Sequence, residues 1–214
     1  MKQFSNQWGC QKPGESVWAA LLGMKSGSQL TLIGWNVVES GGRVGLLALS
    51  AAEPLVVPPR GRTRGMLDVI GGLVQAHEAG LAAMSGGTTE DPPLDQALSR
   101  ADRLVPSGAE LIVASGFDAP GPGLADRLDA LSRRRMPRLV FVTDAQIDRL
   151  PRGRYPIRMD DGRRIRVRLG GGPADPPAHI RQIAGRQALV LDAGETIEQT
   201  ARRIVAAFPA ERAA

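Results

Sequence analysis

The stretch SGGTTEDPPLDQALSRADRLV, residues 85–105, read together with AELIVASGFDAPG, residues 109–121, decides the fold expected for this chain. The first is a glycine-rich turn that carries two hydroxyls and an acidic pair and leads into a helix. The second is an apolar strand that ends in another polar turn. In an open α/β sheet such turns lie at one edge, beyond the carboxyl ends of the strands, where ligands usually bind. The two stretches therefore predict a sheet with a polar binding edge.

Composition and length favour one packed domain in the cytoplasm. The 214 residues are 43% hydrophobic, which is enough to bury a core. No apolar run reaches the ~18 residues of a membrane-spanning helix, and the polar N-terminal residues do not resemble a signal peptide. The single cysteine, Cys10, cannot form an internal disulfide, which fits a reducing compartment. The formal net charge of +5 permits nucleic-acid binding but does not indicate it, because 22 acidic residues are interspersed.

Buried strands alternate with helices along most of the chain. Apolar runs without alternation are typical of strands buried on both faces, and spacings of three and four residues predict amphipathic helices. The expected strands are 43–50, 54–59, 110–115, 138–144 and 187–194. The expected helices are 62–83, one through Leu94 and Leu104, 123–135 and 195–208. A loop at 85–93 precedes the second of them, and Asp91 or Pro92 suits its first turn. This order predicts an α/β fold with a doubly wound, mostly parallel sheet and helices on both faces.

The N-terminal segment departs from that repeat. Residues 15–39 favour a helix of uneven quality, interrupted by glycines, and an extended 29–35 is the alternative. Residues 1–14 have no hydrophobic period and read as irregular, and SGGR at 40–43 is a helix stop. No strand is therefore expected ahead of residue 43.

Two hairpins are expected. The link between 43–50 and 54–59 is too short for a parallel crossover, so these strands should pair antiparallel, with prolines confining the second to a sheet edge. Residues 155–169 alternate with period two around Asp161-Gly162, which predicts an appended β-hairpin. One of its faces carries arginines and the other carries apolar side chains.

The ordered series RVGLLALS, PLVVPPRGR, GGTTEDPPLDQAL, ELIVASGFDAPG and RLVFVTDA resembles the family of unknown function numbered fifty-eight (DUF fifty-eight), whose members look like von Willebrand factor type A domains. The likeness covers roughly residues 30–169 and, more loosely, the C-terminal strand and helix. It implies a single domain over 1–214, with a core at 15–150, the hairpin at 151–170 and a closing strand and helix at 187–208. Because family members often accompany MoxR-type AAA+ ATPases, it also implies such an ATPase as a partner.

The resemblance further implies a metal-ion-dependent adhesion site built from three turns. The family pattern has Asp-x-Ser-x-Ser after the first strand, a threonine in a GGT-type turn, and an aspartate after the fourth strand. Here Thr88 and Thr89 keep the threonine turn, Gly116 stands where the aspartate is expected, and Asp118 follows two residues later. The resemblance thus leaves Thr88 and Asp118 as the ligands of a degenerate Mg²⁺ site, and no other cofactor is expected.

The first strand of that pattern is central to the sheet, and none is expected here. Three explanations are open: a misassigned or truncated start, direct pairing of 43–50 with 110–115, or a strand donated by a partner. The first is favoured, because unpaired buried backbone groups are costly. An intact mass above 22.7 kDa would support it.

We expect a non-catalytic protein-interaction module that acts as an adaptor for the ATPase in chaperone-like assembly. No zinc site, phosphate loop or nucleophile elbow is present in the sequence, which disfavours a hydrolase or nucleotide-binding enzyme on the same sheet. The alternative is a nucleic-acid-binding module that uses the arginines of 132–138 and of the hairpin. The expected contact surface comprises Thr88, Thr89, Glu90, Asp91, Ser115 and Asp118.

Overall fold

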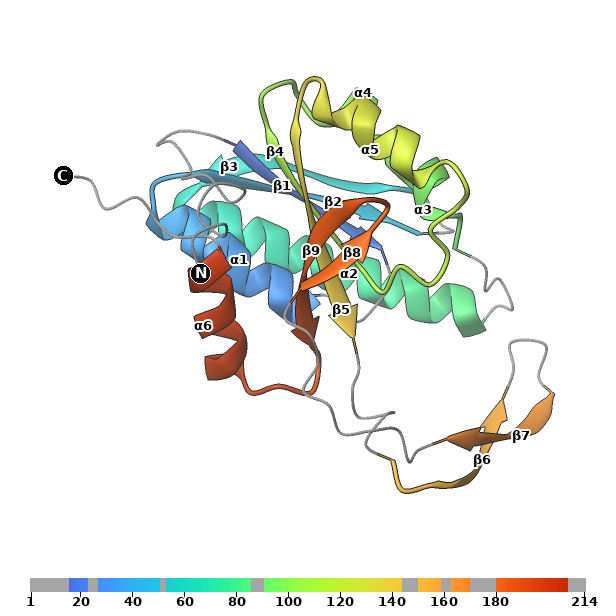
Figure 1. Cartoon of the computed structure of the whole chain (residues 1–214). Coiled ribbons are helices and arrows are strands. Elements are labelled where there is room, and N and C mark those ends of the chain that lie inside the picture. The colour runs from blue at the N-terminus through green and yellow to red at the C-terminus, as the bar shows by residue number, and fades with distance from the viewer. Residues whose placement is uncertain are drawn as a thin grey trace.

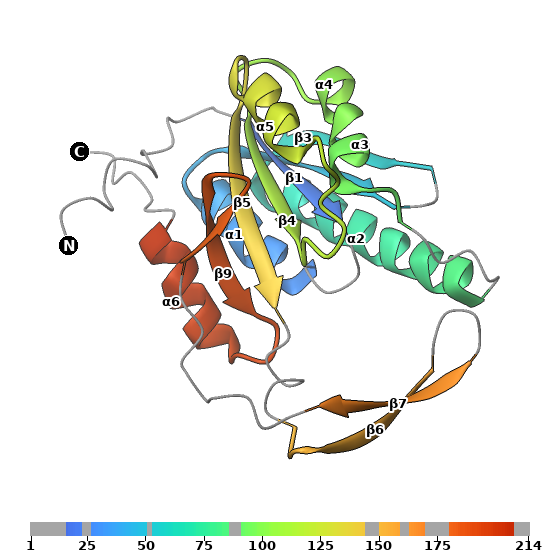
Figure 2. The same ribbon diagram turned by 45° about the vertical axis from the view of Figure 1, so that its right-hand side comes forward.

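A computed structural model describes residues 16–22, 27–50, 53–85, 91–143, 150–158, 163–169 and 180–207. The described part forms three layers, in which one mixed sheet lies between two layers of helices (Figure 1). A two-stranded ribbon stands apart from these layers in both Figure 1 and Figure 2. The predicted irregular segment 1–14 lies outside the described residues.

Seven strands form the main sheet, in the order β3-β2-β1-β4-β5-β9-β8. Their bounds are β1 Ser16–Leu22, β2 Arg43–Leu49, β3 Leu55–Gly61, β4 Glu110–Ser115, β5 Met136–Thr143, β8 Ile180–Ile183 and β9 Arg186–Asp192. The five inner strands are parallel, and the edge strands β3 and β8 run antiparallel to their neighbours. The predicted α/β class with a mostly parallel sheet is confirmed.

The central strand β1 corrects the largest error of the sequence analysis. The segment predicted as one helix over 15–39 divides into β1 and the helix α1 (Gly27–Glu39), so the extended alternative for 29–35 is also wrong. β1 lies between β2 and β4, with Ala19 opposite both Leu46 and Ile112. β1 is hydrogen-bonded to a neighbouring strand on each side. Because these neighbours are distant in sequence, the helix or strand propensity of residues 16–22 does not reveal them. Because β1 is the shared neighbour of β2 and β4, no central strand is missing from the sheet. None of the three explanations offered for its absence is needed.

Helices cover both faces of the sheet (Figures 1 and 2). One face carries α1, α2 (Arg62–Ser85) and α6 (Ile197–Ala207), and the other carries α3 (Leu94–Ser99), α4 (Ala101–Leu104) and α5 (Leu124–Ser132). In β4, Ile112 and Ala114 belong to the first core, whereas Leu111 and Val113 belong to the second. Burial on both faces explains why the parallel strands read as unbroken apolar runs. None of the described helices combines the length and apolar character needed to cross a bilayer.

The helix ends follow local sequence signals. α1 ends in a Schellman turn: Gly41 has a φ of 82°, and the Gly42 N–H donates to the Val37 carbonyl at 2.9 Å. The predicted stop at 40–43 is thus confirmed. α6 begins with a reciprocal capping box, because the Thr196 and Gln199 side chains each accept a hydrogen bond from the other's backbone N–H.

Both edges of the sheet are short antiparallel hairpins. The predicted pairing of β2 with β3 is confirmed, and Pro58 and Pro59 on β3 suit its position at an edge. The sequence analysis missed β8, which pairs with β9 through a two-residue turn at Ala184 and Gly185. Both turn residues have positive φ, 48° and 75°, as tight hairpin turns of the primed types require.

The appended ribbon pairs β6 (Gly153–Arg158) with β7 (Arg164–Leu169) in antiparallel register. This confirms the predicted hairpin, although its turn at Asp161-Gly162 lies outside the described residues. Apart from each other, β6 and β7 make no extensive contact with another described helix or strand.

Candidate functional site

The carboxyl ends of the inner strands meet at one edge of the sheet, because these strands are parallel. β4 reaches this edge at Ser115 and continues into a loop, Gly116 to Gly123, that leads to α5. Of the six expected contact residues, Asp91, Ser115 and Asp118 are described, whereas Thr88, Thr89 and Glu90 lie outside the described residues. The described site is therefore built around the loop after β4.

Ser115 shapes this loop from inside. Its side chain is buried, and its hydroxyl oxygen accepts a hydrogen bond from the Phe117 N–H at 3.1 Å. Phe117 in turn has a φ of 51°, a left-handed conformation that bulky residues rarely adopt. Ser115 thus positions the loop, and its hydroxyl is not presented at the surface as the sequence analysis expected.

Asp118 lies next to the position at which the family pattern has an aspartate. A Cβ atom built on Gly116 would be 2.6 Å from Oδ2 of Asp118, so this carboxylate fills the space that a side chain at 116 would take. Asp118 is exposed, and it makes no hydrogen bond or ion pair within the described part of the chain. Its carboxylate is available to a partner.

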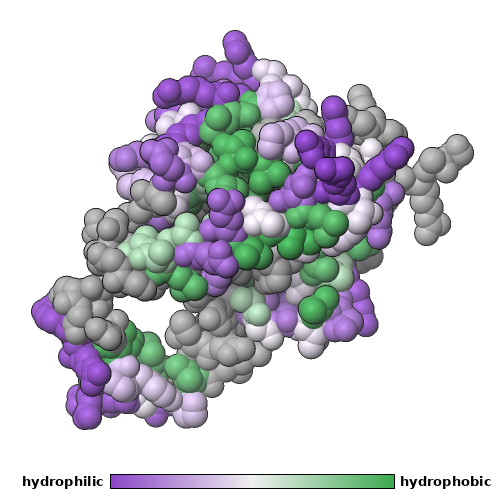
Figure 3. Space-filling view, turned by 180° about the vertical axis from the view of Figure 1, so that it is seen from behind, coloured by the Kyte–Doolittle hydropathy of each residue, from purple (hydrophilic) through white to green (hydrophobic). Residues whose placement is uncertain are grey.

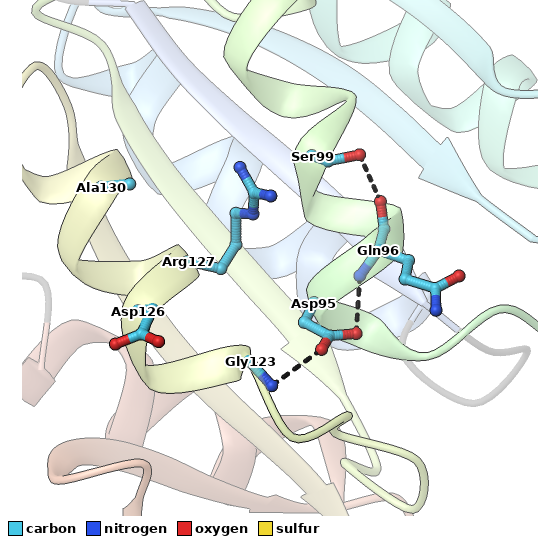
Figure 4. Close-up of a pocket in the computed structure, with 7 residues that line it drawn as sticks. All are labelled: Asp95, Gln96, Ser99, Gly123, Asp126, Arg127 and Ala130. Carbon is cyan, nitrogen blue, oxygen red and sulfur yellow. Dashed lines mark hydrogen bonds between the residues drawn. The ribbon is translucent and has the colours of Figure 1, made fainter.

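The loop after β4 is fastened to the start of α3. The Leu94 N–H donates to the Ala119 carbonyl at 2.9 Å, and the Asp95 N–H donates to the Pro120 carbonyl at 3.2 Å. In return, the Asp95 carboxylate accepts a hydrogen bond from the Gly123 N–H at 2.9 Å (Figure 4). The two stretches predicted to share one edge are indeed joined there, through residues 94 and 95.

These bonds also explain the start of the helix after the glycine-rich turn. The helix begins at Leu94, as the predicted loop up to Pro93 requires, whereas Asp91 and Pro92 lie ahead of its first turn and not in it. Its first donors are satisfied by carbonyls of a loop distant in sequence. The helix also breaks at Arg100, which separates α3 from α4. The tertiary contact that holds this helix start has no signal in the local sequence.

Loss of the Asp95 carboxylate is expected to loosen this junction. In an Asp95→Ala variant the Gly123 N–H loses its acceptor, and we expect the free energy of unfolding to fall by about 1–2 kcal/mol. The neighbouring exposed Gln96 is the control, because Gln96→Ala should change it by less than about 0.5 kcal/mol. Urea unfolding followed by circular dichroism measures both, and equal losses would contradict the assigned role of Asp95.

A second feature of this edge was missed because β8 was missed. A hollow of about 520 Å³ lies between the loop after β4 and β8. In it the rings of Phe117 and Phe141 stack with centroids 6.2 Å apart, and the Arg181 guanidinium lies 4.6 Å from the Phe141 ring centroid. An aromatic pair and a cation beside Asp118 form a mixed surface of the kind that protein interfaces favour.

The sequence analysis also missed a turn at the same edge. Asp192 ends β9 with a buried side chain, and its Oδ1 accepts a hydrogen bond from the Gly194 N–H at 2.9 Å.

The described residues do not fit a magnesium site. Within the described ranges, no three His, Cys, Asp or Glu side chains converge in a way that could hold a metal ion. Magnesium prefers octahedral oxygen ligands that include carboxylates, and Asp118 is the single exposed carboxylate of the loop after β4. We therefore derive no step through a metal.

Comparison with known proteins shows the fold. No protein-family model matches the chain, and no curated protein matches it in sequence. Among solved structures, it is similar to the crystal structure of the conserved hypothetical protein BatB from Bacteroides thetaiotaomicron. The TM-score is 0.51 at 13% sequence identity, and the match covers 91% of this chain and 98% of that chain. At this identity the similarity speaks for a shared architecture alone.

Proposed function

We propose that this chain is a non-catalytic protein-interaction module of the von Willebrand factor A type, related to DUF fifty-eight proteins. Its partner in this proposal is a MoxR-type AAA+ ATPase, for which it serves as an adaptor in chaperone-like assembly. The presence of β1 supports the relationship, because that pattern needs a central first strand. The similarity to BatB over 91% of the chain is compatible with it.

The residues after β1 support a degenerate form of the adhesion site. Aligned with Asp-x-Ser-x-Ser, the sequence has Met24, Ser26 and Ser28, so both serines are kept and the aspartate is replaced by methionine. The second aspartate position holds Gly116, with Asp118 beside it. Two lost carboxylates favour a contact made by hydroxyls and the remaining acids directly, without a bridging metal.

The observation that carries the proposal is the junction between the loop after β4 and the start of α3. Three hydrogen bonds hold the start of α3, the helix that follows the threonine turn, against the loop after β4 that carries Asp118. Asp118, Phe117 and Arg181 then offer a partner an anion, an aromatic ring and a cation within one exposed region. Preorganised, mixed groups of this kind suit protein recognition. The proposal assigns these residues to recognition and gives none of them a catalytic role.

Binding to the ATPase tests the proposal. We expect a folded Thr88→Ala, Asp118→Ala double variant to bind a MoxR-type ATPase of the same organism at least about tenfold more weakly, a loss of ~1.4 kcal/mol. Calorimetric titration, run with Mg²⁺ and with a chelator, measures the affinity, and we expect the same loss in both buffers. Asp126→Ala, an exposed acid on α5, is the matched control and should bind as the wild type does. Wild-type affinity in the double variant would overturn the proposal.

A further inference from the structure

The β6–β7 ribbon gathers arginines on one face. The register places Arg154 opposite Arg168, Pro156 opposite Arg166, and Arg158 opposite Arg164. Residues on the same face of a strand alternate, so these six positions share one side of the ribbon. Arg154, Arg164, Arg166 and Arg168 are exposed, and none of the four pairs with a carboxylate in the described part of the chain.

This arrangement opposes the stability of the ribbon. Like charges directly opposite each other on neighbouring strands are destabilising, and a lone two-stranded hairpin is marginal in water. The ribbon has no third strand and no extensive contact with another described element. A polyanion on the arginine face would remove the repulsion and order the ribbon.

The other face of the ribbon is apolar and turned toward the rest of the molecule. It carries Tyr155, Ile157, Ile165, Val167 and Leu169, of which Ile165 alone is classed as exposed. In Figure 3 the ribbon projects at the lower left, with strongly hydrophilic residues along its outer border and hydrophobic residues on its inner side. The arginine face is therefore the free one.

The opposition of the two faces distinguishes among anionic partners. A membrane contact would need the apolar face as well, because an amphipathic element inserts its apolar side chains among the lipids while its cations reach the phosphates. On the ribbon most of the apolar side chains are already half-buried. A double helix, by contrast, needs only the arginine face, and the major groove of B-form DNA admits a two-stranded β-ribbon. Arg164, Arg166 and Arg168 recur every ~6.8 Å along β7, which equals about two base-pair steps.

We propose that the arginine face of the β6–β7 ribbon binds double-stranded DNA, with the guanidinium groups on the phosphates that flank the major groove. The ribbon lies on the side of the sheet to which the arrowheads of β5 and β9 point. The proposed contact with DNA uses none of the residues assigned to the contact with an ATPase, so the two contacts can be tested separately. Arginine matches phosphate with a planar, bidentate fork of donors. In the absence of other base-reading side chains on this face, the contact is expected to be insensitive to sequence.

The salt dependence of binding tests this proposal. The face has five arginine positions. For a labelled 20-base-pair DNA duplex followed by fluorescence anisotropy, one phosphate contact from each predicts a slope of about −4.5 for log K against log salt. The affinity should therefore fall roughly 500-fold between 50 and 200 mM NaCl. In an Arg164→Gln, Arg166→Gln, Arg168→Gln variant two arginine positions remain, and we expect a slope of about −1.8 and a fall of roughly 12-fold.

A matched variant controls for net charge. Arg100, Arg103 and Arg202 are exposed and lie outside both the ribbon and the arginine cluster at 132–138. Their replacement by glutamine also lowers the formal charge from +5 to +2 by removing three arginines. This control should keep the wild-type slope. Equal slopes in the two triple variants would overturn the proposal, as would binding to vesicles of anionic phospholipid or to duplex RNA with none to duplex DNA.

Discussion

Replacing Arg138 alone, in an Arg138→Met variant, is expected to lower the free energy of unfolding by about 3–5 kcal/mol. Arg138 on β5 forms an ion pair with Glu110, the first residue of β4, at the end of the sheet opposite the candidate site. The Glu110 side chain is fully buried, and 10% of the Arg138 side chain is exposed. Without the guanidinium, a fully buried carboxylate would lose the cation that pairs with it, which is far less favourable than the intact pair.

The double variant Glu110→Leu, Arg138→Met separates this explanation from simple loss of packing. Removing both charges removes the desolvation penalty, so the double variant should recover at least half of the loss. Arg127→Met is the control, because its pair with Asp102 is about one-third exposed and should contribute less than about 1 kcal/mol. Urea unfolding measures all three variants. A double variant that is as unstable as the single one would contradict the argument.

A Gly65→Ala substitution is expected to lower the free energy of unfolding by about 2–4 kcal/mol. β3 ends at Gly61 and α2 begins at Arg62 with no loop between them, a junction that needs a φ of 61° at Arg62. The chain turns so tightly that a Cβ atom on Gly65 would lie 2.1 Å from the Arg60 carbonyl oxygen. Because the obstructing atoms belong to the backbone, they cannot move aside as a side chain can.

The same helix, α2, provides a control position at which alanine is expected to raise the free energy of unfolding. Gly71 is exposed, and a Cβ atom there would meet nothing within 4 Å. Gly71→Ala should therefore raise the free energy of unfolding by about 0.5–1 kcal/mol, since alanine favours the helix over glycine. Thermal unfolding of both variants tests the pair of predictions. A stabilising effect of alanine at both positions would show that the junction does not need glycine at 65.

Several elements could be predicted because local sequence and tertiary environment agree. In ELIVAS at 110–115 the four inner residues, 111–114, are all apolar, as expected of a strand buried on both faces, and the stretch forms β4. The two glycines at 41 and 42 end α1 in the expected turn. The alternating arginines and apolar residues of 155–169 led to the correct hairpin, since period two is a property of a strand alone.

The sheet edge that carries the candidate site could be predicted, but the arrangement of its described residues could be predicted only in part. The edge itself follows from the parallel strands, and the polar turns mark it in the sequence. The buried role of Ser115 and the aromatic hollow beside Asp118 depend on β8, which comes next to this loop through pairing with β9. A residue's exposure at such an edge is set by what folds against it.

The α/β class, the parallel inner strands other than β1 and the appended ribbon follow from hydrophobic period and turn chemistry, which are local properties of the sequence. Two features come from the folded chain alone: Ser16–Leu22 is the central strand, and the first N–H groups of α3 bond to a loop distant in sequence. Both depend on hydrogen-bond partners that are distant in sequence: β2 and β4 for the strand, and Ala119 and Pro120 for the helix. A short apolar segment adopts whichever conformation satisfies its backbone groups, and those partners exist only after the chain has folded.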